Sequence, residues 1–274
     1  MYGKVEFTNN FSITALYTAF IDKRPHNYIF KGESHNFWEI MLVIDGTIGA
    51  TVGSDVILLN KGQAILYEPM EFHRMWCENT DSQIAVLTFD CNNMPISNTF
   101  VFNAEKPLRD KMIKIIKAIQ ANFNMTNISV TSHKENNFLP EQIILKQAEE
   151  LVLNMLINTR IKTESQKLKS AQNYTQIIKV LEANIYNNLN VPDIASLCNM
   201  SEINLKKTFK KYSGMGIKKY YNTLIMNEAT LMLREGLSVA EVAQRLSFND
   251  SNYFSTAFKR IMGTSPIGYK KNTN

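Results

Sequence analysis

The last third of the chain nearly repeats itself, and this duplication limits what the segment can fold into. Residues 205–214 (LKKTFKKYSG) align with residues 254–263 (FSTAFKRIMG) at an offset of 49 residues. Upstream, residues 193–195 align with residues 241–243 at an offset of 48. The sequence therefore predicts two copies of one supersecondary unit, held at a fixed spacing along the chain.

Each copy is predicted to form a helix, a tight turn and a second helix. Asn190 and Pro192 supply a capping residue and a proline in the first turn of a helix in the first copy. Ser238 and Glu241 have the spacing of a capping box, in which each side chain binds a free N–H group at the helix start. Between the copies, residues 217–234 have helical periodicity. We therefore expect one linking helix to join two helix-turn-helix units.

The second helix of such a unit can lie in the major groove of DNA, with one face on the bases and the other anchored in the domain. The apolar Leu205, Phe209, Phe254 and Phe258 are the expected anchoring face. The outward positions are the predicted DNA-binding residues: Ser201, Glu202, Ile203, Lys206, Lys207, Lys210, Lys211, Ser251, Asn252, Ser255, Thr256, Lys259 and Arg260. Those near each helix start are expected on base edges, and the later cations on phosphates.

The charge of the chain is unevenly distributed. Residues 161–274 contain 16 Lys/Arg against 8 Asp/Glu, whereas residues 1–160 contain 14 against 17. Cations gain affinity for a polyanion by releasing its condensed counterions, so the basic part is suited to double-stranded DNA. Composition alone favours the alternative interpretation, a solvated basic surface.

The N-terminal half has a different pattern. Short apolar runs at 40–44, 56–59, 64–67 and 84–89 alternate with turn signals, which predicts a compact antiparallel barrel or sandwich. Apolar residues then recur at helical spacing between 108 and 156, which predicts two amphipathic helices after the strands.

The expected architecture is α+β, in two domains. A sensor and dimerisation domain is expected at 1–160, a polar linker at 161–173 and an all-α DNA-binding domain at 174–274. The apolar stripe of the helix at about 140–160 must be covered, either by its own barrel or by a second subunit of a homodimer.

Cysteine usage and hydropathy suggest where the chain works. Cys77, Cys91 and Cys198 lack the close spacing of a thiolate metal site, which fits a reducing cytoplasm. No segment approaches 18 uninterrupted apolar residues, and the first ten residues lack the pattern of a signal peptide. We therefore expect a cytoplasmic protein without a membrane partner.

The repeated region resembles the DNA-binding signature of the AraC/XylS family of bacterial regulators. The resemblance is carried by residues 194–214, 239–243, 247–248, 251–254, 258–259, 263–266 and Tyr269. It implies a sequence-specific transcription regulator, not an enzyme, with promoter DNA, a small-molecule effector and RNA polymerase as partners. It implies no cofactor.

The N-terminal half resembles the cupin-like sensor barrel of the same family, through residues 34–40 and 62–74. Cupin enzymes place histidines and a glutamate on one metal, and His35, Glu39 and His73 match that set, with Glu33 in place of the first expected histidine. On one strand, residues 35, 37 and 39 would share a face.

We expect this set to form a metal-free effector pocket. Its predicted lining is His35, Phe37, Glu39, Met41, Tyr67, His73 and Met75. Two alternatives remain: a metal-dependent cupin enzyme with a helical appendage, and a regulator with no small ligand.

Overall fold

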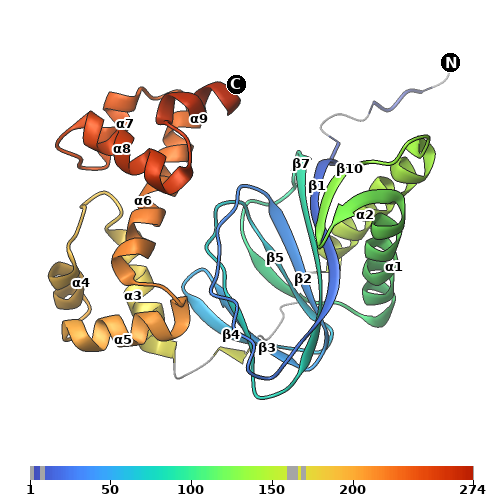
Figure 1. Ribbon diagram of the computed structural model, residues 1–274, viewed down its shortest axis with the longest axis horizontal. Coiled ribbons are helices and arrows are strands. Elements are labelled where there is room, and N and C mark those ends of the chain that lie inside the picture. Colours follow the sequence, from blue (N-terminus) through green and yellow to red (C-terminus); the bar gives the residue numbers. More distant parts are fainter. Residues whose placement is uncertain (1–2, 7–9, 159–165, 168–170, 274) are drawn as a thin grey trace. The chain divides into compact units, whose positions relative to one another are not determined.

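The computed structural model describes residues 3–6, 10–158, 166–167 and 171–273. The chain divides into two compact units, Met1–Leu168 and Lys169–Asn274. The first contains two β-sheets and two long helices, and the second is helical (Figure 1). The predicted α+β class is confirmed.

The first unit is built from two antiparallel sheets. The larger contains, in spatial order, β8 (Phe100–Asn103), β5 (Gln63–Tyr67), β2 (Trp38–Asp45), β7 (Ser82–Asn92), β1 (Ser12–Arg24), β10 (Ser129–His133) and β9 (Phe123–Thr126). The smaller contains β11 (Gln166–Lys167), β4 (Asp55–Asn60), β3 (Thr47–Val52) and β6 (Met75–Cys77). The predicted apolar runs correspond to β2, β4, β5 and β7, whereas β1 and the hairpin of β9 and β10 were not predicted.

Strand β2 separates two apolar clusters. Because side chains alternate along a strand, Ile40 and Leu42 pack in a cluster with α1 (Lys106–Asn122) and α2 (Phe138–Asn158). Met41 and Val43 belong to the other cluster, between the two sheets. Glu39 has the parity of Met41, so its carboxylate points into the interior between the sheets.

The apolar stripe of α2 covers the protein's own sheet. Ile144, Ala148, Leu151, Val152 and Met155 are buried in the same cluster as Ile40 and Leu42. A second set of apolar side chains on α2 stays exposed: Phe138, Leu139, Ile143, Leu153 and Ile157.

The second unit is built around a shared helix (Figure 1). Its helices are α3 (Gln172–Ala183), α4 (Val191–Leu197), α5 (Glu202–Ser213), α6 (Ile217–Arg234), α7 (Val239–Arg245), α8 (Ser251–Met262) and α9 (Pro266–Thr273). Helix α6 contacts α5 at one end of the unit, and it contacts α7, α8 and α9 at the other. It is the linking helix that the sequence predicted.

The predicted linker at 161–173 is only partly visible. Residues 161–165 and 168–170 lie outside the described residues. Residues 166–167 form β11 and pair with Leu58 and Ile57 of β4, and α3 begins at Gln172. The middle of this polar segment and its last two residues therefore have regular structure that its composition did not predict.

Within the described part of the chain, no helix combines the length and the apolar character needed to cross a bilayer.

Candidate functional site

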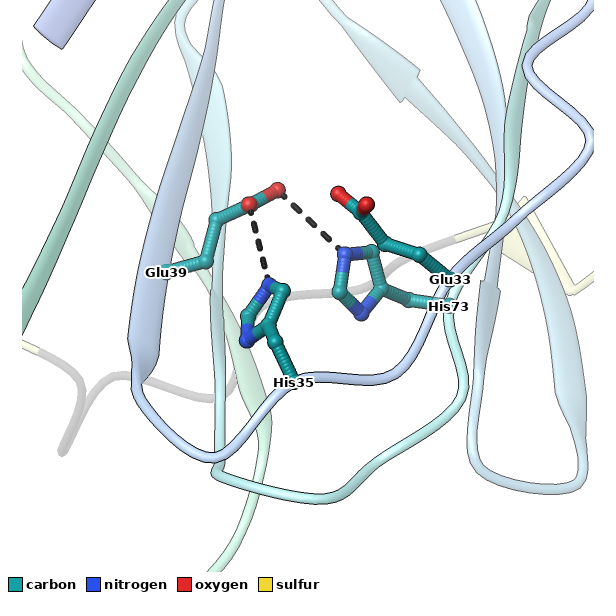
Figure 2. Close-up of side chains that lie close together, drawn as sticks. All are labelled: Glu33, His35, Glu39 and His73. Carbon is teal, nitrogen blue, oxygen red and sulfur yellow. Dashed lines mark hydrogen bonds and ion pairs between the residues drawn. The ribbon is translucent and has the colours of Figure 1, made fainter. Parts of the chain in front are cut away.

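Four acidic and imidazole side chains meet inside the first unit (Figure 2). Nitrogen or oxygen atoms of Glu33, His35, Glu39 and His73 all lie within 4.8 Å of one another. His35 Nε2 is 3.3 Å from Glu39 Oε2, and His73 Nε2 is 3.6 Å from Glu39 Oε1. The side chains of His35, Glu39 and His73 are 11%, 12% and 4% exposed. The three residues that the sequence singled out lie together, and the exposed Glu33 joins them.

The backbone positions these groups in two ways. Glu33 and His73 form an isolated β-bridge, in which each N–H donates to the other residue's carbonyl at 3.0 Å. The prediction that His35 shares a strand with Glu39 is wrong, because β2 begins at Trp38 and the chain bends just before it. The ring of His35 instead stacks on Phe37 at 3.9 Å, and from there its Nε2 reaches Glu39.

Both imidazole rings are oriented by backbone carbonyls. His35 Nδ1 lies 3.0 Å from the carbonyl of Phe37, and His73 Nδ1 lies 3.1 Å from the carbonyl of Glu71. A carbonyl only accepts, so each Nδ1 carries the hydrogen. In a neutral ring Nε2 then has a lone pair, and in both rings that lone pair faces Glu39.

Glu39 needs positive charge beside it. Burial favours the neutral acid, but the charges of His73 and His35, when protonated, and the hydrogen bond from His35 outweigh it and lower the pKa of Glu39 below its ordinary value. A buried carboxylate is stable as an anion only with such a partner. Protons on the two rings or a bound cation can supply that charge.

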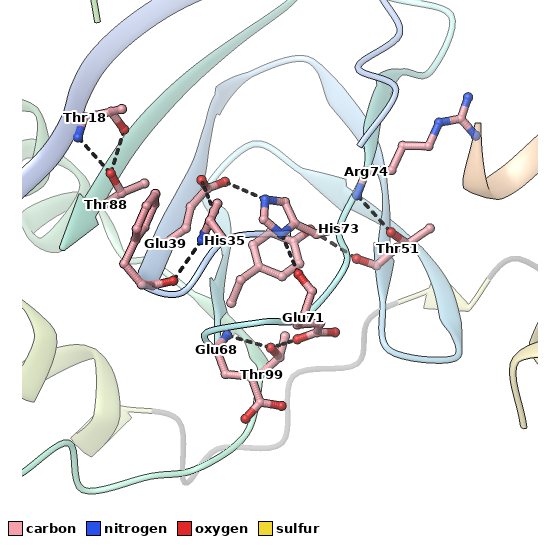
Figure 3. Close-up of polar contacts among 12 residues, drawn as sticks. Thr18, His35, Glu39, Thr51, Glu68, Glu71, His73, Arg74, Thr88 and Thr99 are labelled. Carbon is pink, nitrogen blue, oxygen red and sulfur yellow. Dashed lines mark hydrogen bonds and ion pairs between the residues drawn. The ribbon is translucent and has the colours of Figure 1, made fainter. Parts of the chain in front are cut away.

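A network of hydrogen bonds around Glu71 supports His73 (Figure 3). The carboxylate of Glu71 accepts from the N–H of Gly53 and from the hydroxyl of Thr99. The Thr99 hydroxyl oxygen in turn accepts from the N–H of Glu68 at 2.9 Å. These contacts hold the Glu71 segment, whose carbonyl orients His73. Glu71 was not among the predicted site residues.

A cavity of about 330 Å³ adjoins the cluster. Six of the seven predicted lining residues line it: Phe37, Glu39, Met41, Tyr67, His73 and Met75. His35 does not, although it contacts Glu39. Several other lining residues were not predicted from the sequence, among them Phe20 on β1, Tyr28 and the two cations Arg24 and Arg74. The cavity thus combines apolar and aromatic walls with groups of both charges, as sites for small organic molecules do.

In the second unit, α5 presents cations to solvent. Its N-cap is Ser201, whose hydroxyl accepts from the N–H of Asn204 at 3.3 Å. Ile203 is 81% exposed. Glu202 is half-buried and pairs with Lys206 at 2.8 Å. The other predicted DNA contacts of this helix, Lys207, Lys210 and Lys211, are exposed.

Helix α8 repeats this arrangement with neutral polar groups. Asp250 caps it by accepting from the N–H groups of Asn252 and Tyr253. Asn252, Thr256, Lys259 and Arg260 are exposed, and Ser251 and Ser255 are half-buried. The Thr256 hydroxyl donates to the carbonyl of Asn252 at 2.9 Å. Tyr253, which was not predicted as a contact, is 64% exposed.

The opposite faces of both helices are fully buried. Leu205, Phe209, Phe254 and Phe258 are each 0% exposed. The preceding helices α4 and α7 begin with the capping boxes of Asn190 with Asp193 and of Ser238 with Glu241. Both copies are therefore folded helix-turn-helix units whose second helix has one anchored and one exposed face.

Two protein families match separate parts of the chain. Residues 16–95 match the AraC-like ligand binding domain, and residues 194–272 match a helix-turn-helix domain. The first match includes the Glu33, His35, Glu39 and His73 cluster, and the second runs from α4 into α9. Together they cover more than half of the chain.

Individual proteins match over a shorter part of the chain or with lower sequence identity. The Msm operon regulatory protein of Streptococcus mutans is 35% identical over 97 residues, which are 35% of this chain and 35% of that protein. The uncharacterized HTH-type transcriptional regulator YidL of Escherichia coli is 37% identical over 100 residues, 36% of this chain and 34% of that protein. The match thus spans about a third of the length of these curated relatives.

Among solved structures, ToxT of Vibrio cholerae is 14% identical, with a TM-score of 0.37 over 93% of this chain and 96% of that one. The matches to both families and the folded helix-turn-helix pair agree with the resemblance carried by the repeat. This chain belongs to the AraC/XylS family of transcription regulators.

Proposed function

We propose that this chain is a sequence-specific DNA-binding transcription regulator, controlled by a small-molecule effector in the first unit's cavity. The observation that carries the proposal is the duplicated helix-turn-helix, in which α5 and α8 each have one fully buried and one exposed polar face. Such helices dock in the major groove through the exposed face. We propose regulation, not catalysis, as the activity of the whole protein.

In this proposal, the N-terminal parts of α5 and α8 read bases. Ile203, Lys206 and Lys207, then Asn252, Ser255 and Thr256, face base edges, while Ser201, Glu202 and Ser251 lie at the helix starts. Lysine can donate to guanine, asparagine can pair with adenine, and an exposed isoleucine can contact a thymine methyl group. Lys210, Lys211, Lys259 and Arg260 lie further along and contact phosphates.

Exchanging single lysines of α5 is expected to separate these roles. Lys206→Ala or Lys207→Ala should change the preferred bases, because each removes a donor to a base edge, at a cost of about 1–3 kcal/mol on the cognate site. Lys210→Ala should weaken binding to cognate and random DNA by the same factor, because a phosphate contact carries no sequence information. Selection of bound sequences from a random pool, followed by affinity measurements, checks both.

Lys210→Ala also serves as the matched control, since it removes the same charge from the same exposed helix. Equal losses on cognate and random DNA for all three variants would overturn the assignment of roles.

The cavity is the proposed effector site. A ligand that binds only the folded protein raises its unfolding temperature by mass action, so a thermal-shift screen with small metabolites tests this part. A hit should be lost when Met41→Trp fills the cavity, and a hit that survives this change binds elsewhere.

The proposed function includes an assembly state, a further partner and a compartment. We propose a homodimer, supported by the exposed apolar residues of α2, which include Leu139 at 71% and Ile157 at 67% exposure. RNA polymerase is proposed as a further partner at the promoter, and the cytoplasm as the compartment.

A further inference from the structure

The cluster of Glu33, His35, Glu39 and His73 contains more hydrogen-bond acceptors than donors. The Nδ1 hydrogens of both rings are already given to backbone carbonyls. His73 is 3% exposed, and its Nε2 has no hydrogen-bond partner. A buried polar atom without a partner is rare in a folded protein and calls for an explanation such as a bound ion.

We propose that this cluster binds one divalent transition-metal ion through His35 Nε2, His73 Nε2 and the Glu39 carboxylate. A carboxylate oxygen of Glu33 is the fourth ligand, at the exposed side. The proposal revises the sequence-based expectation of a metal-free pocket. It goes beyond regulation of DNA binding and does not depend on it.

The spacing of the atoms suits a shared ion. Metal bonds to imidazole nitrogen and carboxylate oxygen are about 2.0–2.2 Å long, which puts neighbouring ligand atoms roughly 3–3.5 Å apart. The observed separations are 3.3 Å for His35 Nε2 to Glu39 and 3.6 Å for His73 Nε2 to Glu39. Only small side-chain movements are then needed to bring these atoms onto one ion.

The ligand atoms determine which class of metal ion fits the site. Two imidazoles with one or two carboxylates suit Zn²⁺, Fe²⁺ or Mn²⁺, whereas Ca²⁺ and Mg²⁺ prefer oxygen ligands alone. The surroundings fit as well, because a metal-binding histidine usually donates its second N–H to a carbonyl or carboxylate. Both rings do so here, and the Glu71 segment behind His73 is itself held by hydrogen bonds.

Two protons could replace the metal, by converting both rings to cations that donate to Glu39. These protons are the alternative to the metal ion, and a metal titration distinguishes the two possibilities. Since Glu33, Glu39 and His73 also line the 330 Å³ cavity, the ion would face the cavity interior.

The test uses the full chain with its affinity tag removed, stripped with chelator and then titrated with Zn²⁺ by calorimetry and with Co²⁺ by visible absorption. One ion per chain is expected. The Co²⁺ protein should show ligand-field bands of nitrogen and oxygen coordination that Zn²⁺ abolishes. Absence of saturable binding to the wild-type chain would overturn the proposal, whatever any variant does.

Variants locate the ion. Glu39→Gln and His73→Gln should each weaken binding by more than the roughly 10–100-fold that outer-shell changes cost. Glu39→Gln keeps the side-chain volume, and its amide can donate to a histidine lone pair, so we expect this variant to fold without metal. Far-UV circular dichroism of the stripped proteins checks this.

The other two histidines provide matched controls. His26 lies 3.2 Å from Asp81, and His133 lies 2.6 Å from Glu141, so each is also paired with a carboxylate. His26→Gln and His133→Gln should leave the affinity unchanged. Loss of binding in these variants, or unchanged binding in Glu39→Gln and His73→Gln, would place the ion elsewhere and contradict the proposal.

Discussion

The triple variant Lys207→Glu, Lys210→Glu and Lys211→Glu is expected to bind cognate DNA on the order of 10³-fold more weakly than the wild-type chain at physiological salt. All three lysines are exposed on α5. Each reversal adds a repulsive charge in the groove, and those of Lys210 and Lys211 also remove a phosphate contact. The slope of log K against log salt should also fall by about 2, one for each of the phosphate contacts of Lys210 and Lys211. Fluorescence anisotropy over a range of salt concentrations measures both quantities.

A second triple variant controls for net charge. Lys106, Lys114 and Lys117 are exposed on α1 of the first unit, and exchanging all three for Glu changes the charge of the chain by the same amount. Its DNA affinity should fall far less, because long-range charge is screened beyond about 8–10 Å in physiological salt. Equal losses in the two triple variants would show that overall charge, and not α5, governs binding.

Phe258→Ala is expected to destabilise the second unit by about 3–5 kcal/mol, as large-to-small changes at buried aromatic residues do. Phe258 is 0% exposed and lies between the rings of Phe254 and Tyr269, at centroid distances of 5.8 and 5.9 Å. Removing its ring leaves a cavity beneath the exposed face of α8. Urea unfolding followed by circular dichroism at 222 nm should show the helical transition at a lower urea concentration.

Tyr253→Ala on the same helix is the matched control. Tyr253 is 64% exposed, so little packing is lost, and the stability should change by less than about 1 kcal/mol. A similar shift for both variants would contradict the buried position of Phe258.

The second unit was predictable because its signals are local. The capping residue Asn190 and the capping box of Ser238 with Glu241 were predicted from neighbouring residues, and the structure has both. The repeat then predicted the second helix of each copy and its buried face. Helix starts and apolar periodicity are properties of a short segment, so they can be read without knowing the fold.

The first unit was less predictable because its strands pair over long distances. Strand β1 pairs along its length with β7, from Ser12 opposite Asn92 to Arg24 opposite Ser82. Most of its side chains are half-buried, so it lacks the clear alternation of buried and exposed residues. Without that strand, the sequence could not place Phe20 or Arg24 in the cavity.

The site itself was found in part. His35, Glu39 and His73 were recognised by residue type and spacing, and they do lie together. Their geometry was not predictable: a bend before β2 removes His35 from the strand, and the pairing of Glu33 with His73 is a tertiary bridge. The supporting role of Glu71 likewise depends on contacts with Gly53 and Thr99, far away in sequence.

In the proposed function, α5 and α8 read two neighbouring major grooves of one duplex. Methylation interference on a bound promoter fragment tests it directly, because methyl groups on guanine N7 block contacts in the major groove. We expect two interfering segments on one face of the DNA, with centres about 10 base pairs apart. A single segment, or two segments on opposite faces, would contradict it.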